Sequence, residues 1–193
     1  MARTPSTMLA LGTPAPSFAL PDVVTGRTVT LEEMSDGDAL LVVFWCNHCP
    51  FVHHIEDAFV DFAREFAGRG LKTVAISAND VEKYPQDGPG EMRARANQRS
   101  YPFPYLYDEG QEVAKEYEAA CTPDLFLFGS EGRLVYRGQF DASRPGLDVP
   151  VTGQDLRNAV EAVLAGAAPS EQQTPSVGCN IKWRPGNEPA YFG

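Results

Sequence analysis

Two cysteines separated by two residues, Cys46 and Cys49, are the residues of this 193-residue sequence whose types and spacing point most directly to chemistry. They follow an apolar run over residues 40–45 and precede a segment with helical spacing. A CxxC pair at such a junction is typical of a dithiol that is oxidised to a disulfide and reduced again. Because unpaired N–H groups at a helix start favour a thiolate, we predict that Cys46 is the nucleophile and that Cys49 resolves the mixed disulfide.

His48 lies between the two cysteines. An imidazolium at that position would favour the thiolate form of Cys46. We therefore expect the pKa of Cys46 to lie well below the ~8.5 of a free cysteine, and the disulfide to be readily reduced. This chemistry needs no organic cofactor, because the redox-active disulfide itself carries the electrons.

A metal site is the main alternative use of the cysteine pair. Zinc usually takes two CxxC pairs, or one such pair with two histidines. The histidines close in sequence to the motif are His53 and His54, and His53 is the i+4 neighbour of Cys49. A metal site formed by Cys46, Cys49 and His53 therefore stays open, as does a pair that is buried only for packing.

The composition excludes several classes of function. A net charge of -10 provides no basic stripe to neutralise nucleic-acid phosphates. Four cysteines in a chain of this length do not form a disulfide scaffold. No segment approaches the ~20 apolar residues that cross a bilayer, and the first apolar run is too short for a secretory signal. We expect a cytoplasmic protein that binds neither nucleic acid nor membrane.

The segments around the cysteines predict how they are positioned. The unbroken apolar run of residues 40–45 is typical of a strand buried on both faces at the centre of a sheet. Apolar residues at helical spacing follow up to residue 66, and residues 71–78 predict a second strand. Such a strand–helix–strand unit has parallel strands. The loop that begins at Asn79 should therefore lie beside the cysteines.

The rest of the chain predicts a hairpin over 12–34, helices over 91–99, 109–117 and 152–165, an extended segment over 101–107, and a hairpin of 124–128 with 133–137. Thr152 is the expected N-cap of the last helix. This order predicts an α/β fold with parallel strands first and an antiparallel pair later. We expect one domain over residues 1–168 and an extended C-terminal arm over 169–193, packed back on it because Ile181 and Trp183 favour burial.

Several motifs together resemble a known family. Trp45-Cys46-x-x-Cys49, followed by Thr122-Pro123 before a hairpin, resembles the thioredoxin fold. Further stretches are similar to a bacterial peroxiredoxin-like group of the redoxins (alkyl hydroperoxide reductase/thiol-specific antioxidant type): residues 14–20, 46–50, 101–108, 121–124, 136–140 and 178–183. The resemblance implies a central mixed sheet flanked by helices, with Trp45 beside the pair and Pro123 in cis facing the disulfide. It also implies that Thr122 offers its backbone to an extended partner chain.

The sequence also departs from these relatives. With Cys49 aligned to the peroxidatic cysteine of peroxiredoxins, Val42 and Cys46 stand where those enzymes have a proline and a hydroxyl residue. Leu40 stands where thioredoxins bury an aspartate.

Two other cysteines are candidates for additional redox thiols. Cys121 lies two residues before Pro123, so a thioredoxin fold would bring it near the pair, and Cys179 lies in the arm. Simple packing is the alternative for both, since buried free cysteines are common.

We therefore predict an enzyme, a thiol-disulfide oxidoreductase that cycles Cys46 and Cys49 between dithiol and disulfide. Its partners would be protein or small-molecule disulfides and thiols, together with a cellular reductant. A thiol-dependent peroxidase of the alkyl hydroperoxide reductase type is one alternative. A metal-binding or redox-sensing module on the same fold is another, since fold does not fix function.

Overall fold

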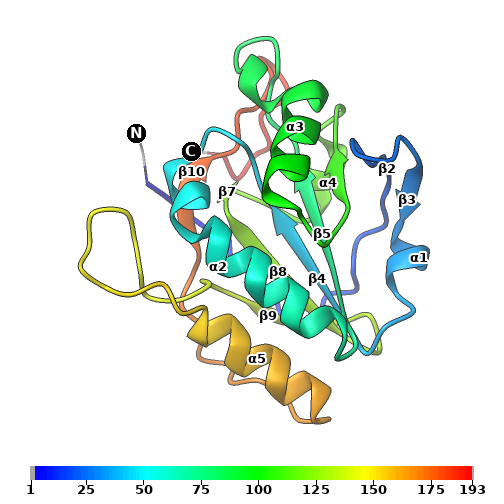
Figure 1. Ribbon diagram of the computed structural model, residues 1–193, viewed down its shortest axis with the longest axis vertical. Coiled ribbons are helices and arrows are strands. Elements are labelled where there is room, and N and C mark those ends of the chain that lie inside the picture. The colour runs from blue at the N-terminus through cyan, green and yellow to red at the C-terminus, as the bar shows by residue number, and fades with distance from the viewer. Residues whose placement is uncertain (1–2, 193) are drawn as a thin grey trace.

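A five-stranded mixed sheet forms the centre of the protein, whose structure is a computed structural model that describes residues 3–192. Its strand order is β6-β5-β4-β8-β9, and Figure 1 labels the last four of these strands. The strands are β4 (Ala39–Phe44), β5 (Leu71–Ser77), β6 (Tyr105–Tyr107), β8 (Asp124–Gly129) and β9 (Leu134–Arg137). The first three run parallel and the last two add antiparallel. The predicted α/β fold with a mixed sheet is confirmed.

Strand β4 occupies the middle of the sheet because both of its faces are apolar. All six of its residues are buried. Leu41 and Val43 pack into one hydrophobic cluster, whereas Leu40 and Val42 pack into a second cluster on the other face. Successive side chains of a strand point to opposite faces. An unbroken apolar run therefore fixes β4 between two covering layers, and its end delivers the cysteine motif to one edge of the sheet.

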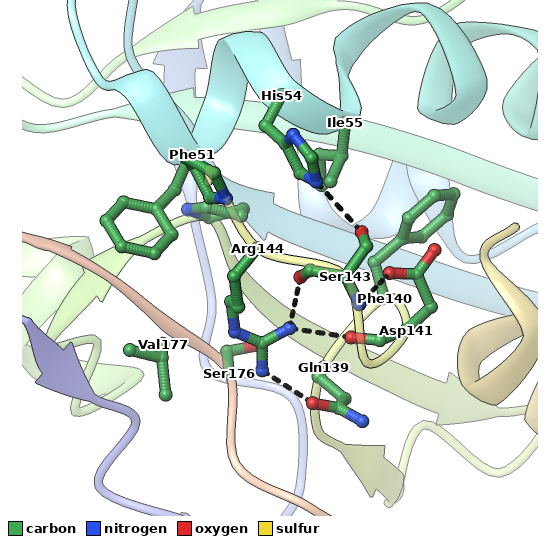
Figure 2. A pocket seen from close by; sticks show the side chains of 12 residues that line it. Phe51, His54, Ile55, Gln139, Phe140, Asp141, Ser143, Arg144, Ser176 and Val177 are labelled. Atoms are coloured by element: carbon green, nitrogen blue, oxygen red, sulfur yellow. Dashed lines mark hydrogen bonds between the residues drawn. The ribbon is translucent and has the colours of Figure 1, made fainter. Parts of the chain in front are cut away.

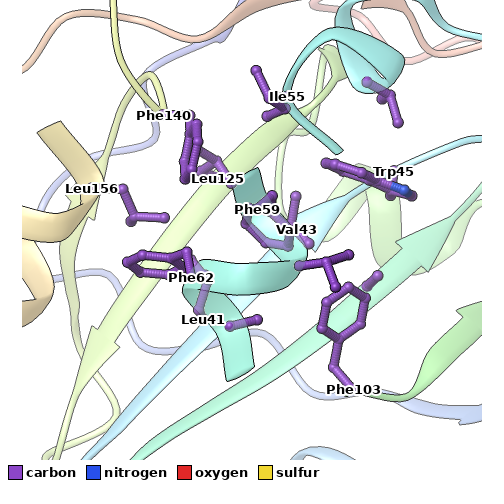
Figure 3. Close-up of a cluster of buried hydrophobic side chains, with 14 of the residues drawn as sticks. Leu41, Val43, Trp45, Ile55, Phe59, Phe62, Phe103, Leu125, Phe140 and Leu156 are labelled. Atoms are coloured by element: carbon purple, nitrogen blue, oxygen red, sulfur yellow. The ribbon is translucent and has the colours of Figure 1, made fainter. Parts of the chain in front are cut away.

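Helices α2 (Pro50–Ala67), α3 (Pro89–Arg99) and α5 (Gln154–Leu164) contribute to the first cluster. Phe59 and Phe62 of α2 belong to this cluster, and Figure 3 shows them between the strands and Leu156 of α5. Phe59 packs against Trp45, with ring centroids 5.1 Å apart. This packing sets the height of α2 above the end of β4, which is where the cysteines lie.

The N-cap of α5 differs from the prediction. Gly153, not Thr152, caps the helix, with a φ of 65°. A Cβ atom at Gly153 would lie 2.4 Å from the ring of Phe140. Only glycine satisfies both the left-handed backbone and this close approach, and the spacing of the helix did not reveal the contact.

The second face is covered by the hairpin of β2 (Ala19–Pro21) and β3 (Thr28–Thr30), by α1 (Leu31–Met34) and by α4 (Glu112–Glu116). The predicted N-terminal hairpin is confirmed. A capping box between Thr30 and Glu33 begins α1. No helix of the described residues 3–192 is long and apolar enough to cross a membrane.

The C-terminal arm returns to the domain as a strand. Strand β10 (Val177–Asn180) lies between β1 (Thr4–Pro5) and β7 (Cys121–Thr122) in a three-stranded sheet. Ile181 and Trp183 follow it and are 1% and 6% exposed, so their predicted burial is confirmed. The arm thereby brings the chain beside Thr122, next to the cysteine motif (Figure 1).

A buried carboxylate ties α2 to α3. Glu56 is 1% exposed and forms ion pairs with Arg95 and Arg99. It also accepts a hydrogen bond of 2.7 Å from the hydroxyl of Tyr101, which in turn accepts one of 3.0 Å from Nε1 of Trp45. Burial raises the pKa of Glu56, but the hydrogen bonds from Arg95 and Tyr101 outweigh it and leave the pKa below its usual value.

We predict that Glu56→Gln lowers the free energy of unfolding by roughly 2 kcal/mol at neutral pH, because Arg95 loses its partner while remaining partly buried. A carboxyl with a depressed folded-state pKa stabilises the fold above its unfolded pKa of ~4.3, and this contribution is lost as the pH falls through the folded value. Urea denaturation should therefore show a difference between wild type and Glu56→Gln that shrinks below about pH 4.

Glu65→Gln is the matched control on the same helix. The carboxylate of Glu65 pairs with Arg157 at 2.7 Å but its side chain is 45% exposed. We expect a clearly smaller change than in Glu56→Gln, because water screens this exposed ion pair. Equal losses in the two variants, or a difference for Glu56→Gln that is independent of pH, would contradict the role assigned to Glu56.

Candidate functional site

The two cysteines lie in the turn that joins β4 to α2. Helix α2 begins at Pro50, and Cys49 is its N-cap. Cys49 is therefore closest to the unpaired N–H groups of the helix, whereas the sequence analysis assigned the effect of these groups to Cys46. The two residues are 1% and 0% exposed.

Thr122 contacts both sulfur atoms. Its Oγ1 lies 3.2 Å from Sγ of Cys46, and its carbonyl oxygen accepts a hydrogen bond of 3.1 Å from Sγ of Cys49. The peptide bond between Thr122 and Pro123 is cis, as the resemblance implied. The predicted Cys46, Cys49, Thr122 and Pro123 thus come together at the edge of the sheet.

A third thiol, that of Cys179, joins this pair. Its hydrogen bond with Cys49 is the largest effect that lowers the pKa of the Cys49 thiol, and the hydrogen bond from Cys46 lowers it further. The same hydrogen bond raises the pKa of Cys179. Burial raises the pKa of Cys46, and its hydrogen bond to Cys49 adds to the effect. As a thiol, Cys49 donates to Thr122. Of the three cysteines it is the one whose ionisation the hydrogen bonds of the cluster favour.

The predicted low pKa of Cys46 is wrong, and the position of His48 explains why. Nδ1 of His48 lies 2.5 Å from Oδ2 of Asp87. The imidazole stacks on Tyr84, with ring centroids 5.2 Å apart. Any positive charge on the ring is paired with a carboxylate, and the negative charge of Asp87 itself contributes to raising the pKa of Cys46.

Asp87 was not foreseen from the sequence. It is fully buried, in the short 3-10 helix η1 (Pro85–Asp87) of the loop after β5. Its Oδ1 accepts hydrogen bonds from the backbone N–H groups of Asn47 at 2.8 Å and His48 at 3.2 Å. Oδ2 accepts one of 2.8 Å from Nδ2 of Asn79. The predicted position of this loop beside the cysteines is confirmed, and the parallel strands were the signal that found it.

The metal site considered from the sequence does not assemble. In residues 3–192 the ligand atoms of Cys46, Cys49 and His53 do not form a group, and Nε2 of His53 contacts the carbonyl oxygen of Asn47 instead. Sγ of Cys46, Nδ1 of His48 and Oδ2 of Asp87 do lie within 4.8 Å of one another. His48 and Asp87 are hydrogen-bonded to each other there.

The side chains of Trp45 and Cys121 form their hydrogen bonds outside the cluster of Cys46, Cys49 and Cys179. The indole of Trp45 is directed into the first hydrophobic cluster and donates to Tyr101, so Trp45 anchors the motif to the core. Sγ of Cys121 donates to the carbonyl oxygen of Pro123 at 3.5 Å. Neighbouring residues of a strand face opposite sides, so Cys121 points away from the sulfurs that the side chain of Thr122 meets.

A pocket reaches Pro123 between α2, the loop of residues 139–145 and the arm, as Figure 2 shows. Phe51 and Val177 form apolar walls. Arg144 donates to backbone carbonyl oxygens of its own loop and to Oε1 of Gln139. The cysteine sulfurs are not part of its lining. A substrate disulfide therefore needs local movement of the chain to meet either sulfur.

The whole chain has a close structural counterpart. A crystal structure of a conserved protein from Geobacillus kaustophilus has a TM-score of 0.94 at 49% identity, covering 96% of this chain and 98% of that one. A thiol:disulfide interchange protein of the thioredoxin family from Chlorobium tepidum, 19% identical, has a TM-score of 0.61, covering 81% and 99%. The fold is therefore the thioredoxin fold.

Sequence comparison gives a consistent result. The model of the AhpC/TSA family matches residues 11–137. The thiol-disulfide oxidoreductase ResA of Halalkalibacterium halodurans is 23% identical over 124 residues, covering 64% of this chain and 65% of ResA. The chloroplastic peroxiredoxin Q of Populus jackii is 26% identical over 144 residues, covering 69% and 62%. The chain thus aligns with just under two thirds of the length of these two proteins.

We predict that the reduced protein has one thiol whose pKa lies far below the ~8.5 of a free cysteine, and that this thiol is Cys49. Titration of thiolate ultraviolet absorbance should show this thiolate in wild type and its loss in Cys49→Ser. Cys121→Ser, which removes an equally buried thiol outside the cluster, should retain it. Loss of the acid-stable thiolate in Cys46→Ser with retention in Cys49→Ser would instead restore the assignment made from the sequence.

Proposed function

We propose that this chain, which belongs to the AhpC/TSA family, is a thiol-disulfide oxidoreductase whose Cys46 and Cys49 cycle between dithiol and disulfide. The convergence of both sulfurs on Thr122, beside the cis Pro123, carries the proposal. The relationship to ResA supports it. The substrates would be protein or small-molecule disulfides, with a cellular thiol as the reductant, and the cysteine pair would hold the electrons without an organic cofactor.

Cys46 is the better candidate for attack on a substrate. Cys49 is enclosed by the carbonyl oxygen of Thr122 on one side and by Cys179 on another. Cys46 neighbours His48, whose side chain is 16% exposed, so solvent is closest on that side. A substrate that displaces His48 or its loop would therefore meet Cys46 first.

The hydrogen bond between the two thiols gives the proton of Cys46 a path to Cys49 during this attack. As the Cys46 sulfur bonds to a substrate sulfur, its proton passes to the Cys49 thiolate, with which it is already hydrogen-bonded. The substrate disulfide breaks, and its other sulfur leaves as a thiolate. That thiolate takes the proton from Cys49, which then attacks the Cys46 sulfur and releases the second substrate thiolate. The protein ends as a disulfide, and the substrate has gained two electrons.

A peroxidase is the second candidate, and one contact favours it. The hydroxyl residue that peroxiredoxins carry before their cysteine is missing here, but Oγ1 of Thr122 lies 3.2 Å from Sγ of Cys46. A hydroxyl at that distance can hydrogen-bond a peroxide oxygen as it approaches the sulfur. The relationship to peroxiredoxin Q adds support for this alternative.

Trapping with oxidised glutathione tests the exchange reaction. We expect wild type to form the Cys46–Cys49 disulfide, because Cys49 resolves the first adduct. Cys49→Ser should accumulate a glutathione adduct on Cys46, detected by intact mass and peptide mapping. An adduct on Cys46 that persists equally in wild type would refute the resolving role of Cys49. Wild type that forms neither adduct nor disulfide would refute the exchange activity.

Hydrogen peroxide separates the two candidates. We expect peroxide to oxidise Cys46 no faster than it oxidises a free thiol, and Thr122→Val to leave this rate unchanged. The valine keeps the branched shape and removes only the hydroxyl. Fast formation of sulfenic acid on Cys46 in wild type, with a large loss of rate in Thr122→Val, would favour the peroxidase instead.

A further inference from the structure

The arm occupies the backbone edge that the resemblance assigned to a partner chain. Strand β10 pairs antiparallel with β7, with Cys179 opposite Thr122 and Asn180 opposite Cys121. Thr122 is the residue immediately before Pro123. A segment from the protein's own C-terminal region therefore takes the position of an extended substrate beside the cysteine pair.

The spacing between the arm and Thr122 is set by a glycine. A Cβ atom at Gly178 would lie 2.0 Å from the carbonyl oxygen of Thr122 and 3.2 Å from the nitrogen of Pro123. Any side chain would push the two backbones apart. The arm is thus seated directly on the peptide groups that flank the cis bond.

Hydrogen bonds hold the arm on both sides of Cys179. Before it, the carbonyl oxygen of Ser176 accepts from the N–H of Ser6 at 2.9 Å. After it, the N–H of Lys182 donates to Oδ1 of Asn79 at 2.8 Å, and the carbonyl oxygen of Lys182 accepts from the N–H of Asp80 at 2.7 Å. Cys179 is consequently fixed in place and is 2% exposed.

The register puts the Cys179 sulfur on the side of the reactive pair. Directly opposed residues of an antiparallel pair share one face of the sheet. The side chain of Thr122 meets Sγ of Cys46, so Cys179 faces the same side. It packs in one cluster with Cys46 and Cys49 and hydrogen-bonds with Cys49.

We propose that Cys179 is a third redox-active thiol, which exchanges with the Cys46–Cys49 disulfide and covalently joins the arm to the start of α2. The proposal rests on the proposed function. The Cys179 thiolate attacks Sγ of Cys49, the Cys49–Cys179 bond forms and the Cys46–Cys49 bond breaks. Cys46 leaves as a thiolate and takes up the proton that Cys179 lost, so the exchange involves no net oxidation or reduction.

The charges of the oxidised state favour this attack. In the dithiol state, the hydrogen bond with Cys49 raises the pKa of Cys179. Once Cys49 is part of a disulfide it is no longer a thiolate, and this effect disappears. Burial still raises the pKa of Cys179 in that state, and the ammonium group of Lys182 still lowers it.

Cys46→Ser provides the first test, because it removes the usual disulfide partner of Cys49 and leaves Cys179 beside it. The variant is oxidised with diamide, and its disulfides are mapped by mass spectrometry of peptides. We expect loss of two thiols as an intramolecular Cys49–Cys179 disulfide. Adding Cys179→Ser should abolish this disulfide. Adding Cys121→Ser should preserve it, because the thiol of Cys121 is equally buried but lies on the opposite face. A disulfide between Cys49 and Cys121, or no intramolecular disulfide, would overturn the proposal.

Wild type provides the second test and separates this proposal from the exchange activity itself. After one equivalent of diamide and an acid quench, we expect both the Cys46–Cys49 and the Cys49–Cys179 disulfides. The Cys46–Cys49 disulfide alone would overturn the proposal and leave the proposed function intact. If wild type forms neither of these disulfides, the proposed function fails.

Gly178→Ala provides an independent test of the arm. It should reduce the share of the Cys49–Cys179 disulfide severalfold in wild-type background, because the added Cβ displaces the arm. Far-ultraviolet circular dichroism and a cooperative urea transition of the same sample report that the domain is folded. An unchanged share would overturn the role given to the seated arm.

Discussion

The close contact between Gly178 and Thr122 is the constraint on which the geometry of the site depends. Thr122 meets Cys46 through its hydroxyl and Cys49 through its carbonyl oxygen. That same carbonyl lies so close to β10 that no Cβ fits at Gly178. Thr122 therefore fixes three sulfurs at once, two from the turn before α2 and one from the arm. None of these contacts is local in the sequence.

Burial makes the placement of charge in this cluster consequential. An unpaired charge is costly in an apolar interior, whereas a thiolate that accepts hydrogen bonds from neighbouring thiols is stabilised. Cys49 has two such neighbours, Cys46 and Cys179, and the helix N-terminus adjoins it. Asp87 carries a second negative charge nearby, and it is satisfied by two backbone N–H groups, by Asn79 and by His48. Neutral hydrogen-bond donors and one imidazole thus stabilise the anionic forms of Cys49 and Asp87.

Local sequence patterns predicted the strands and helices that position the cysteines, because each of these elements is determined by residues within it. The apolar run of β4 and the helical spacing of α2 each follow from residues within one element, and they place Cys46 and Cys49 at the sheet edge. The cis state of Pro123 required a family resemblance, since most bonds that precede proline are trans.

The charges of the site could not be predicted in the same way. His48 was expected to stabilise the Cys46 thiolate, but its partner is Asp87, far along the chain in a loop without a regular pattern. The Cys179 sulfur reaches Cys49 because of the register of β10, and a one-residue shift would turn its side chain to the other face. Gly178 is required by its contact with the backbone of Thr122, and Gly153 by its contact with the ring of Phe140. The spacing of residues along the sequence does not reveal either contact. The sequence therefore predicted the type of reaction but not the placement of charges at the site.

Asn79 connects the arm to the charges beside Cys46. Its Nδ2 donates to Asp87, and its Oδ1 accepts from the backbone of Lys182 in the arm. The amide nitrogen thus serves Asp87, and the amide oxygen serves the arm. Separation of the arm from Asn79 would leave Oδ1 without this donor, and a buried amide that loses a partner reorients or gains water. The position of the arm and the environment of the carboxylate that raises the pKa of Cys46 are therefore physically linked through a single side chain.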